Sequence, residues 1–285
     1  MLTSTSPPVI LTIAGFDPSG GAGLIADIRT VVAFGCTPVA AMTSLTMQNS
    51  EGVFGAIHQT PEALRAQILP VVREFRVAAV KIGMLPTREI VLEVARLLQE
   101  TKMPAPVVDP VLRSTSGYEL IDPEAREVLL SELMSLARLI TPNIPEAEIL
   151  TGTRITNETD MLGAARKLRE MGARAVLIKG GHLKQRSAVR GQRSVEVELN
   201  HQAIDILDDD GLVTGFRGEW IDSPPVRGTG CMLSSAIAAC LGLGMDLQHS
   251  VSAAKRFVAD AISFAPKFGP DPVTLELTEM ARLEE

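Results

Sequence analysis

The sequence predicts an α/β protein: a three-layer α/β/α sandwich around a mainly parallel central sheet with antiparallel edge strands. Between residues 9 and 179, short β-branched apolar runs alternate with amphipathic segments of helix length, which is typical of a parallel sheet with helices on both faces. Between residues 195 and 221 the pattern changes to short alternating runs separated by Asp, Gly and Asn, which favours antiparallel edge strands. The 285 residues are 46% hydrophobic and contain no long linker, so we expect a single domain over residues 1–285.

Each apolar run or amphipathic segment gives one expected element, in chain order. The expected strands cover residues 9–14, 38–46, 78–83, 105–109, 139–141 and 175–179, followed by the edge strands within 195–221. The expected helices cover residues 20–34, 62–75, 88–100, 123–136 and 158–171, and three more close the chain at 228–242, 247–265 and 272–283. In such a sheet the carboxyl ends of the parallel strands meet at one edge, where open α/β sheets bind ligands.

Composition and charge exclude several classes of partner and site. The net charge is −7 and the chain has no basic block, which argues against nucleic acid and favours a small-molecule partner. No signal peptide and no apolar run of membrane-spanning length is present, so we expect a cytoplasmic protein without membrane contact. The three cysteines form no CxxC pair, and Cys36 and Cys240 are expected to be small core residues. The four histidines lack zinc-site spacing.

A glycine-rich segment, GFDPSGGAG from Gly15 to Gly23, connects the first expected strand to the first helix. Its glycines allow close approach of backbone N–H groups to a ligand. The spacing matches neither the GxGxxG motif nor the GxxxxGK[ST] phosphate loop, so a loop shaped only for packing is the alternative. Asp27 follows in the helix. On a partly buried stripe its carboxylate needs a partner, such as an amino group or ring nitrogen of a heteroaromatic ligand; the alternative is a solvated helix acid.

The second expected strand ends in TMQNSEG, so the amides of Gln48 and Asn49 are expected at the same edge of the sheet as the glycine-rich segment. An amide both donates and accepts hydrogen bonds, which suits the N–C–N edge of an aminopyrimidine. Capping of a turn explains Asn49 equally well.

Two carboxylates and a lysine follow at further strand ends. Asp109 in VVDP and Glu146 in TPNIPEAEIL can serve Mg²⁺, directly or through water, because Mg²⁺ prefers oxygen ligands and keeps much of its hydration. For Glu146, capping of a helix that starts near Asn143 is an equal alternative. Lys179 ends the apolar strand AVLIK before GGH, so we expect it to bind phosphate; the alternative is a lysine that only extends toward solvent.

The sharpest local signal is VRGTGCMLSSAIAACLG, in which Gly228, Thr229, Gly230 and Cys231 open a helix of small and apolar residues. Free N–H groups and the helix dipole at such an N-terminus stabilise negative charge, so we expect an anion hole for a transferring phosphoryl group. The same field is expected to lower the pKa of Cys231 and to favour its thiolate.

Seven motifs together resemble one known family, the hydroxymethylpyrimidine/phosphomethylpyrimidine kinases of thiamine biosynthesis. Their order and spacing match that family over roughly residues 9–270: GFDPSGGAG, TMQNSEGV, VKIGML, VVDPVL, ITPNIPEAEILTG, VLIKGGH and RGTGC. The resemblance implies a ribokinase-like fold, ATP and Mg²⁺ as cofactors, and phosphorylation of 4-amino-5-hydroxymethyl-2-methylpyrimidine. It leaves open whether the monophosphate is a second substrate.

Carried over by motif position, the resemblance assigns a role to each candidate residue. It implies that the pyrimidine is held by Gln48 and Asp27, and that Gly15 and Met84 line its pocket. It implies that Asp109 and Glu146 organise magnesium, and that Lys179 and Thr229 contact the nucleotide. It also implies that Gly228 and Gly230 belong to the anion hole, and that Cys231 stands where related sugar kinases carry a general base.

The chain departs from the family pattern in two places. Arg227 stands where the family usually carries a histidine before GTGC, and the segment GPDPVTLE lacks the glycine-rich, histidine-bearing stretch often found there. Both departures bear on the second phosphorylation more than on the first.

A pyridoxal or pyridoxine kinase is the alternative activity. A third hypothesis is a binding protein without catalysis. The presence of Asp109, Lys179 and Cys231 together argues against it. The exposed edge strands favour a homodimer.

Overall fold

The computed structural model describes residues 6–114, 116–181, 183, 202–221, 223 and 226–263. The strands are β1 (Val9–Phe16), β2 (Thr37–Gln48), β3 (Val53–His58), β4 (Val77–Ile82), β5 (Val107–Val108), β6 (Leu139–Ile140), β7 (Ala175–Lys179), β8 (Gln202–Asp209) and β9 (Leu212–Glu219). The helices are α1 (Gly23–Ala33), α2 (Pro61–Glu74), α3 (Arg88–Thr101), α4 (Pro123–Val128), extended by a π-helical turn (Leu129–Leu133) and a 3-10 turn (Met134–Leu136), α5 (Ile144–Thr151), α6 (Glu158–Glu170), α8 (Thr229–Gly242) and α9 (Leu247–Ser263). No helix formed by these residues has the length and apolar character needed to cross a membrane.

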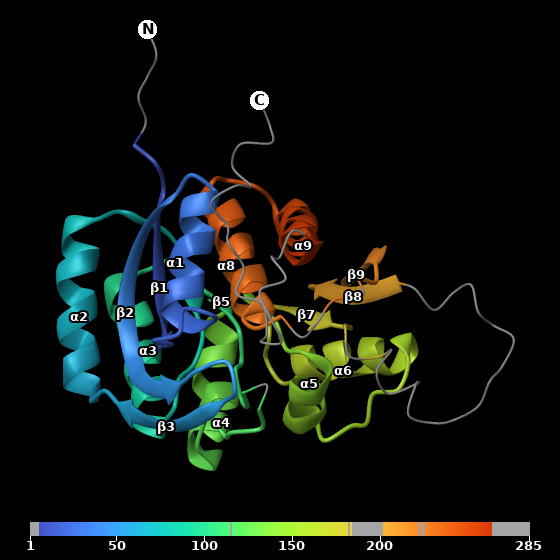
Figure 1. The fold of residues 1–285 in the computed structure, drawn as a ribbon, viewed down its shortest axis with the longest axis horizontal. Coiled ribbons are helices and arrows are strands. Elements are labelled where there is room, and N and C mark those ends of the chain that lie inside the picture. The colour runs from blue at the N-terminus through green and yellow to red at the C-terminus, as the bar shows by residue number, and fades with distance from the viewer. Residues whose placement is uncertain are drawn as a thin grey trace, which may run out of the picture.

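The described strands form one sheet of nine strands in the order β3-β2-β1-β4-β5-β6-β7-β8-β9 (Figure 1). The six strands from β2 to β7 in this order run parallel, whereas β3, β8 and β9 are each antiparallel to their neighbours. The predicted mainly parallel sheet with antiparallel edge strands is therefore confirmed. The expected helix at 272–283 and the beginning of the edge-strand region, 195–201, lie outside the described residues.

Strand β3 is an element that the sequence pattern does not predict. Its six residues contain a central glycine, Gly55, and alternate only weakly between apolar and polar side chains. The strand forms because it pairs with β2, where Leu45 faces Ile57. The two strands are joined by a turn in which the N–H of Asn49 donates to the carbonyl oxygen of Gly52 at 3.1 Å. Pairing across the turn, rather than local pattern, decides this edge of the sheet.

Helices cover both faces of the sheet and complete the three predicted layers (Figure 1). Helices α1, α8 and α9 pack on one face, and α2 to α6 pack on the other. Helix α3 illustrates the local cause: Ile90, Val94 and Leu97 recur at spacings of four and three and are all buried. Its first turn is capped by Thr87, whose side chain accepts a hydrogen bond from the N–H of Ile90 at 3.4 Å.

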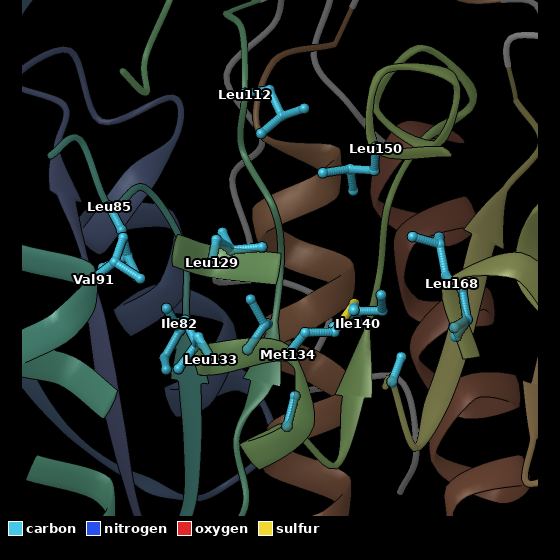
Figure 2. Close-up of a cluster of buried hydrophobic side chains, with 14 of the residues drawn as sticks. Ile82, Leu85, Val91, Leu112, Leu129, Leu133, Met134, Ile140, Leu150 and Leu168 are labelled. Carbon is cyan, nitrogen blue, oxygen red and sulfur yellow. The ribbon is translucent and has the colours of Figure 1, made fainter. Parts of the chain in front are cut away.

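The larger core lies between the sheet and helices α2 to α6 (Figure 2). Figure 2 shows Leu133 and Met134 of the helical segment that follows α4 between Ile82 of β4 and Ile140 of β6. Each such side chain stabilises the fold by about 1.5–3 kcal/mol when it is fully removed from water. On the other face α8 packs so closely that a Cβ atom on Gly242 would lie 2.4 Å from Cδ1 of Ile10. Dense packing on both faces fixes the strand ends at which the site residues lie.

Candidate active site

The predicted site residues lie at the carboxyl ends of the parallel strands, along one edge of the sheet. Gly15 lies near the end of β1, Met84 and Asp109 follow β4 and β5, Glu146 lies in α5 directly after β6, and Lys179 ends β7. This is the edge at which open α/β sheets bind ligands.

The glycine-rich segment is closely packed at two of its glycines: a side chain at Gly15 would require Met84 to shift, and Gly23 has no room for one. A Cβ atom on Gly15 would lie 2.9 Å from Sδ of Met84, and one on Gly23 would lie 2.3 Å from the carbonyl oxygen of Gly15. Gly23 also has a φ of 56°, in the left-handed region that favours glycine. Packing therefore explains these glycines, and it brings Gly15 and Met84 side by side.

Asp27 is fully buried, and its partner is a lysine of the sheet. Nζ of Lys81 donates to both carboxylate oxygens of Asp27, at 2.8 and 2.7 Å, and the Ser235 hydroxyl donates to Oδ1 at 2.9 Å. The reading of Asp27 as a solvated helix acid is therefore wrong. A buried carboxylate needs a partner, and here the chain itself supplies one. Contact between Asp27 and a substrate stays a prediction.

Lys81 is the residue of this network that the sequence analysis misses. It is fully buried in the otherwise apolar strand VAAVKI. Burial lowers the pKa of the Lys81 ammonium group, but attraction by Asp27, Cys231 and Asp109 outweighs burial and raises it, so the lysine is charged. The sequence does contain a signal for Lys81, because a single charged residue in an otherwise apolar strand indicates a buried charge, and a buried charge needs a counter-charge.

At the N-terminus of α8, Gly230 lies against an ion pair formed by two predicted site residues. Nζ of Lys179 donates to Oδ1 of Asp109 at 2.7 Å, and the Thr141 hydroxyl donates to the same oxygen at 3.2 Å. A Cβ atom on Gly230 would lie 3.3 Å from Nζ of Lys179 and 3.4 Å from Oδ2 of Asp109. The Lys179 side chain is only 15% exposed, so the reading of a lysine that extends toward solvent is wrong.

Gly228 brings the start of α8 into backbone contact with the glycine-rich segment. It is the N-cap residue of α8 and has a φ of 77°. A Cβ atom on Gly228 would lie 2.1 Å from the carbonyl oxygen of Gly21. The N–H groups that follow, beginning with Thr229, have no carbonyl partner within the helix because they belong to its first turn. They are therefore available to an anion at this point.

Glu146 caps α5, as the alternative reading of this residue predicts. The N–H of Asn143 donates to Oε2 of Glu146 at 2.8 Å, and the N–H of Glu146 donates to Oδ1 of Asn143 at 2.9 Å. Burial raises the pKa of the Glu146 carboxyl to about 7; the positive charge of Lys179 opposes this rise, and the negative charge of Asp109 adds to it. Glu146 therefore changes its charge near neutral pH.

Cys231 lies in the first turn of α8, but the expected lowering of its pKa is wrong. Burial raises the pKa of the thiol to about 11, although the charge of Lys81 and a hydrogen bond from the backbone of Gly23 act to lower it. The cost of removing a thiolate from water outweighs the field of the helix N-terminus. Cys231 is half-buried, whereas Cys36 and Cys240 are buried, as expected for small core residues.

The amides at the end of β2 have different surroundings. The side-chain oxygen of Asn49 accepts hydrogen bonds from the N–H groups of Glu51 at 2.8 Å and Gly52 at 3.3 Å, so turn capping explains Asn49. Gln48 is half-buried, and its side-chain amide forms no hydrogen bond with any described residue. Its donors and acceptor are therefore available to a ligand.

The edge of the sheet thus combines a helix N-terminus, the charged Lys179, and the carboxyl groups of Asp109 and Glu146. Backbone N–H groups and an ammonium group attract phosphate oxygens, whereas carboxyl groups suit a hydrated Mg²⁺ ion. The amide of Gln48, which has no hydrogen bond with the described residues, adds a group that can bind a heterocycle. Chemically, the arrangement suits phosphoryl transfer.

Comparison with known proteins agrees with this chemistry. The model of the phosphomethylpyrimidine kinase family matches residues 17–275. The hydroxymethylpyrimidine/phosphomethylpyrimidine kinase of Aquifex aeolicus is 41% identical over 261 residues, which cover 92% of this chain and 96% of that protein. The crystal structure of phosphomethylpyrimidine kinase from Clostridium difficile is 38% identical with a TM-score of 0.75, over 90% of this chain and 99% of that one. Pyridoxal kinase from Staphylococcus aureus, in complex with AMP-PCP and pyridoxal, is 26% identical with a TM-score of 0.83, over 98% of this chain and 97% of that one.

These structural neighbours confirm the expected ribokinase-like fold. The family match covers nearly the whole chain, and the Aquifex relative matches it over almost its full length. The motifs behind the resemblance are the same segments that meet at the carboxyl edge of the sheet. The chain belongs to the phosphomethylpyrimidine kinase family.

Proposed function

We propose that this chain transfers the terminal phosphoryl group of ATP to the hydroxymethyl group of 4-amino-5-hydroxymethyl-2-methylpyrimidine in thiamine biosynthesis. The observation that carries the proposal is the close packing of Gly230 against the ion pair of Lys179 and Asp109. A Cβ atom on Gly230 would lie 3.3 Å from Nζ of Lys179 and 3.4 Å from Oδ2 of Asp109. A helix N-terminus and an ammonium group at one point stabilise the charge of a phosphoryl group in transfer. Family membership supports kinase activity, and the AMP-PCP complex of the Staphylococcus aureus enzyme supports ATP as the donor.

Each group at the start of α8 has a role in this reaction. The N–H groups of the segment from Gly228 to Gly230 stabilise negative charge on the phosphoryl oxygens, while Lys179 and Thr229 hold the nucleotide phosphates. The substrate hydroxyl oxygen forms a bond to the γ-phosphorus as the bond to the ADP oxygen breaks. The hydroxyl proton passes to the thiolate form of Cys231, which acts as the general base.

The pyrimidine side of the site comprises Gln48, Gly15, Met84 and Asp27. Met84 offers an apolar side chain beside Gly15, and a Cβ atom on Gly15 would require that side chain to shift. Asp27 already accepts three hydrogen bonds, two of them from Lys81. A carboxylate has about four lone-pair sites, so about one is left for an amino group of the substrate.

Replacement of Gln48 by alanine is expected to weaken pyrimidine binding by about 1–3 kcal/mol, because a hydrogen-bonding edge of the ligand is then buried without its partner. ATP binding should change little. Isothermal titration with the pyrimidine alcohol and with ATP measures both effects. Gln99→Ala, at an exposed position of α3, is the matched control. Unchanged pyrimidine affinity in a folded Gln48→Ala variant removes Gln48 from the site.

We also propose that Mg²⁺ binds beside Asp109 and Glu146. No group of three or more His, Cys, Asp or Glu residues among the described residues could hold a metal ion by itself. Two carboxyl groups nevertheless fit Mg²⁺, which is often held by one or two carboxylates together with water and substrate phosphates. When bound, the ion would neutralise charge on the nucleotide phosphates.

The raised pKa of Glu146 predicts a magnesium requirement that depends on pH. With a pKa of about 7, the carboxyl group is mostly protonated at pH 6 and mostly ionised at pH 8. Only the ionised form attracts the cation, so the Mg²⁺ concentration for half-maximal rate should fall as the pH rises from 6 to 8. In Glu146→Gln this concentration should be higher and nearly independent of pH. The same pH dependence in Glu146→Gln would assign the titration to another group.

Pyridoxal phosphorylation is the second candidate, favoured by the TM-score of 0.83 to the Staphylococcus aureus pyridoxal kinase. Mass spectrometry of products from ATP, Mg²⁺ and each alcohol in separate reactions distinguishes the candidates. The proposed function predicts a pyrimidine monophosphate, and a diphosphate shows that the monophosphate is also a substrate. Pyridoxal phosphate as the sole product contradicts the proposal, as does the absence of any phosphorylated product.

We further propose a single-domain cytoplasmic homodimer that associates through an edge strand. At one edge β9 exposes Leu212 and Val213, and at the other β3 exposes Phe54 and Ile57. An unpaired edge strand with exposed apolar side chains is a template for pairing with a second chain. Size-exclusion chromatography with light scattering should give twice the mass of the chain, and a monomer at all concentrations contradicts the proposal.

A further inference from the structure

Arg227 contacts two other segments of the site with one side chain. Its Nη1 atom donates to the carbonyl oxygen of Asn49 at 2.5 Å and to the Ser19 hydroxyl at 3.2 Å, and its Nη2 atom donates to Oδ2 of Asp17 at 3.3 Å. The side chains of Arg227 and Asp17 are 17% and 2% exposed. The pair is thus largely shielded from water, where the charge attraction is stronger than at an open surface.

Asp17, which accepts from Arg227, lies within the glycine-rich segment and hydrogen-bonds its turn. The N–H and the hydroxyl of Ser19 both donate to Oδ1 of Asp17, at 2.8 and 2.6 Å, and the N–H of Gly20 donates to the Asp17 carbonyl oxygen at 3.0 Å. One carboxylate oxygen therefore shapes the turn, and the other accepts from Arg227. The position of Arg227 is linked in this way to the segment that contains Gly15.

Asn49, the second partner of Arg227, is adjacent in the chain to Gln48, which is proposed to bind the pyrimidine. Its side chain is already used to cap the turn, so the backbone carbonyl is the group that accepts from Arg227. Gln48 is the preceding residue and pairs with Val53 of β3. Its side-chain amide has no hydrogen bond with the described part of the chain. Arg227 therefore holds the backbone at the end of the strand that carries Gln48.

Close backbone packing fixes the point from which the arginine extends. Gly228, the next residue, has backbone contact with Gly21, and a Cβ atom on Gly21 would lie 3.7 Å from Nη1 of Arg227. The guanidinium group of arginine presents a planar fork of N–H donors. Arg227 uses two nitrogens of that fork to contact Asn49 and Asp17 at the same time.

We propose that Arg227 is a positioning residue for the pyrimidine: it holds Gln48 through Asn49 and the glycine-rich segment through Asp17. The inference rests on the proposed function, because it concerns the substrate of the same site. Arg227 acts through other residues and does not touch the reacting atoms. Its loss should therefore affect pyrimidine binding more than the phosphoryl-transfer step.

The test compares the steady-state kinetics of Arg227→Ala and Arg227→Lys with those of the wild-type protein, varying the pyrimidine alcohol and ATP in turn. Arg227→Ala should raise KM for the pyrimidine alcohol about tenfold or more, while kcat and KM for ATP change less than about threefold. Arg227→Lys keeps the charge but loses the fork, so its KM should lie between the two. Arg217→Ala, which removes an exposed ion pair with Glu158, is the control for loss of an arginine.

The outcomes separate this inference from the proposed function. If the wild-type protein does not phosphorylate the pyrimidine alcohol, the proposed function fails and the inference fails with it. If it does, and folded Arg227→Ala has the same pyrimidine KM as Arg217→Ala, only the inference is overturned. A lower kcat with unchanged KM also overturns it. Should Arg227→Ala not fold, a pyrimidine KM in Arg227→Lys equal to that of the control overturns it.

Discussion

Replacement of Cys231 by alanine is expected to lower kcat for pyrimidine phosphorylation by roughly 10² to 10⁴, the range typical for loss of a general base. The substrate hydroxyl then has no acceptor for its proton at the N-terminus of α8. Pyrimidine affinity should be largely kept, because the proposed pyrimidine contacts lie on other elements. Cys231→Asp should restore part of the rate, since a carboxylate again offers a proton acceptor at this position.

The pH dependence of the rate is the sharper test of this role. With a pKa of about 11, only a fraction on the order of 10⁻⁴ of Cys231 is thiolate at pH 7. The thiolate fraction rises about tenfold for each pH unit below the pKa. At saturating Mg²⁺, where ionisation of Glu146 does not limit the rate, the wild-type kcat should therefore increase between pH 7 and pH 10, and the profile of Cys231→Ala should be flat over this range. An alanine variant with the wild-type rate shows that catalysis rests on Lys179 and the N–H groups of Gly228 to Gly230.

Alkylation provides a measurement of the thiol itself. Burial also raises the pKa of Cys36, and it raises that of Cys240 to about 11, so thiolate content does not favour Cys231 over Cys240. Cys231 is the half-buried thiol of the three, and access should make it react first. Bound pyrimidine alcohol should slow the modification. Equal modification of all three cysteines would contradict the position of Cys231 at an open site.

Replacement of Lys81 by methionine is expected to destabilise the fold by about 3–5 kcal/mol, because it removes the ammonium group that stabilises the charge of the buried Asp27 carboxylate. Burial already raises the pKa of Asp27 against the effect of Lys81, so ionisation of this carboxyl without Lys81 is costly. Both side chains are fully buried, and the ammonium group lies 2.7 Å from Oδ2 of Asp27. Urea unfolding followed by circular dichroism measures the change in the free energy of unfolding. Lys167→Met removes an exposed lysine of α6 and is the matched control, with an expected change close to zero.

The double variant Lys81→Met with Asp27→Leu removes both charges and should recover most of the lost stability, because an apolar pair can replace a buried ion pair without an unpaired charge. Its kinetics then separate two roles of Asp27. If stability returns but pyrimidine KM stays raised, Asp27 also serves the substrate; if both return, the pair is structural. A single Lys81→Met variant as stable as Lys167→Met contradicts the dependence of Asp27 on Lys81.

Most of the fold follows from local pattern. The alternation of apolar runs and amphipathic segments predicts the parallel strands and their helices, because period and composition act over a few residues. The same pattern predicts that Asp109, Glu146 and Lys179 share one edge of the sheet, since parallel strands all end there. Strand β3 is an exception, because its local pattern is weak and pairing with β2 decides it. Helix α5 is expected only through the alternative role of Glu146 as a capping residue.

The state of each site residue is set by neighbours that are distant in the chain. Asp27 and Lys81 are 54 residues apart, and Arg227 lies 178 residues from Asn49. The sequence identifies Cys231 at a helix N-terminus and predicts a lowered pKa, but burial in the folded protein raises the pKa to about 11. By itself the sequence determined the architecture, the edge of the sheet that holds the site and the residues gathered there. Only the tertiary structure decided their partners and ionisation, because desolvation and charge pairing depend on which groups the fold brings together and how far it removes them from water.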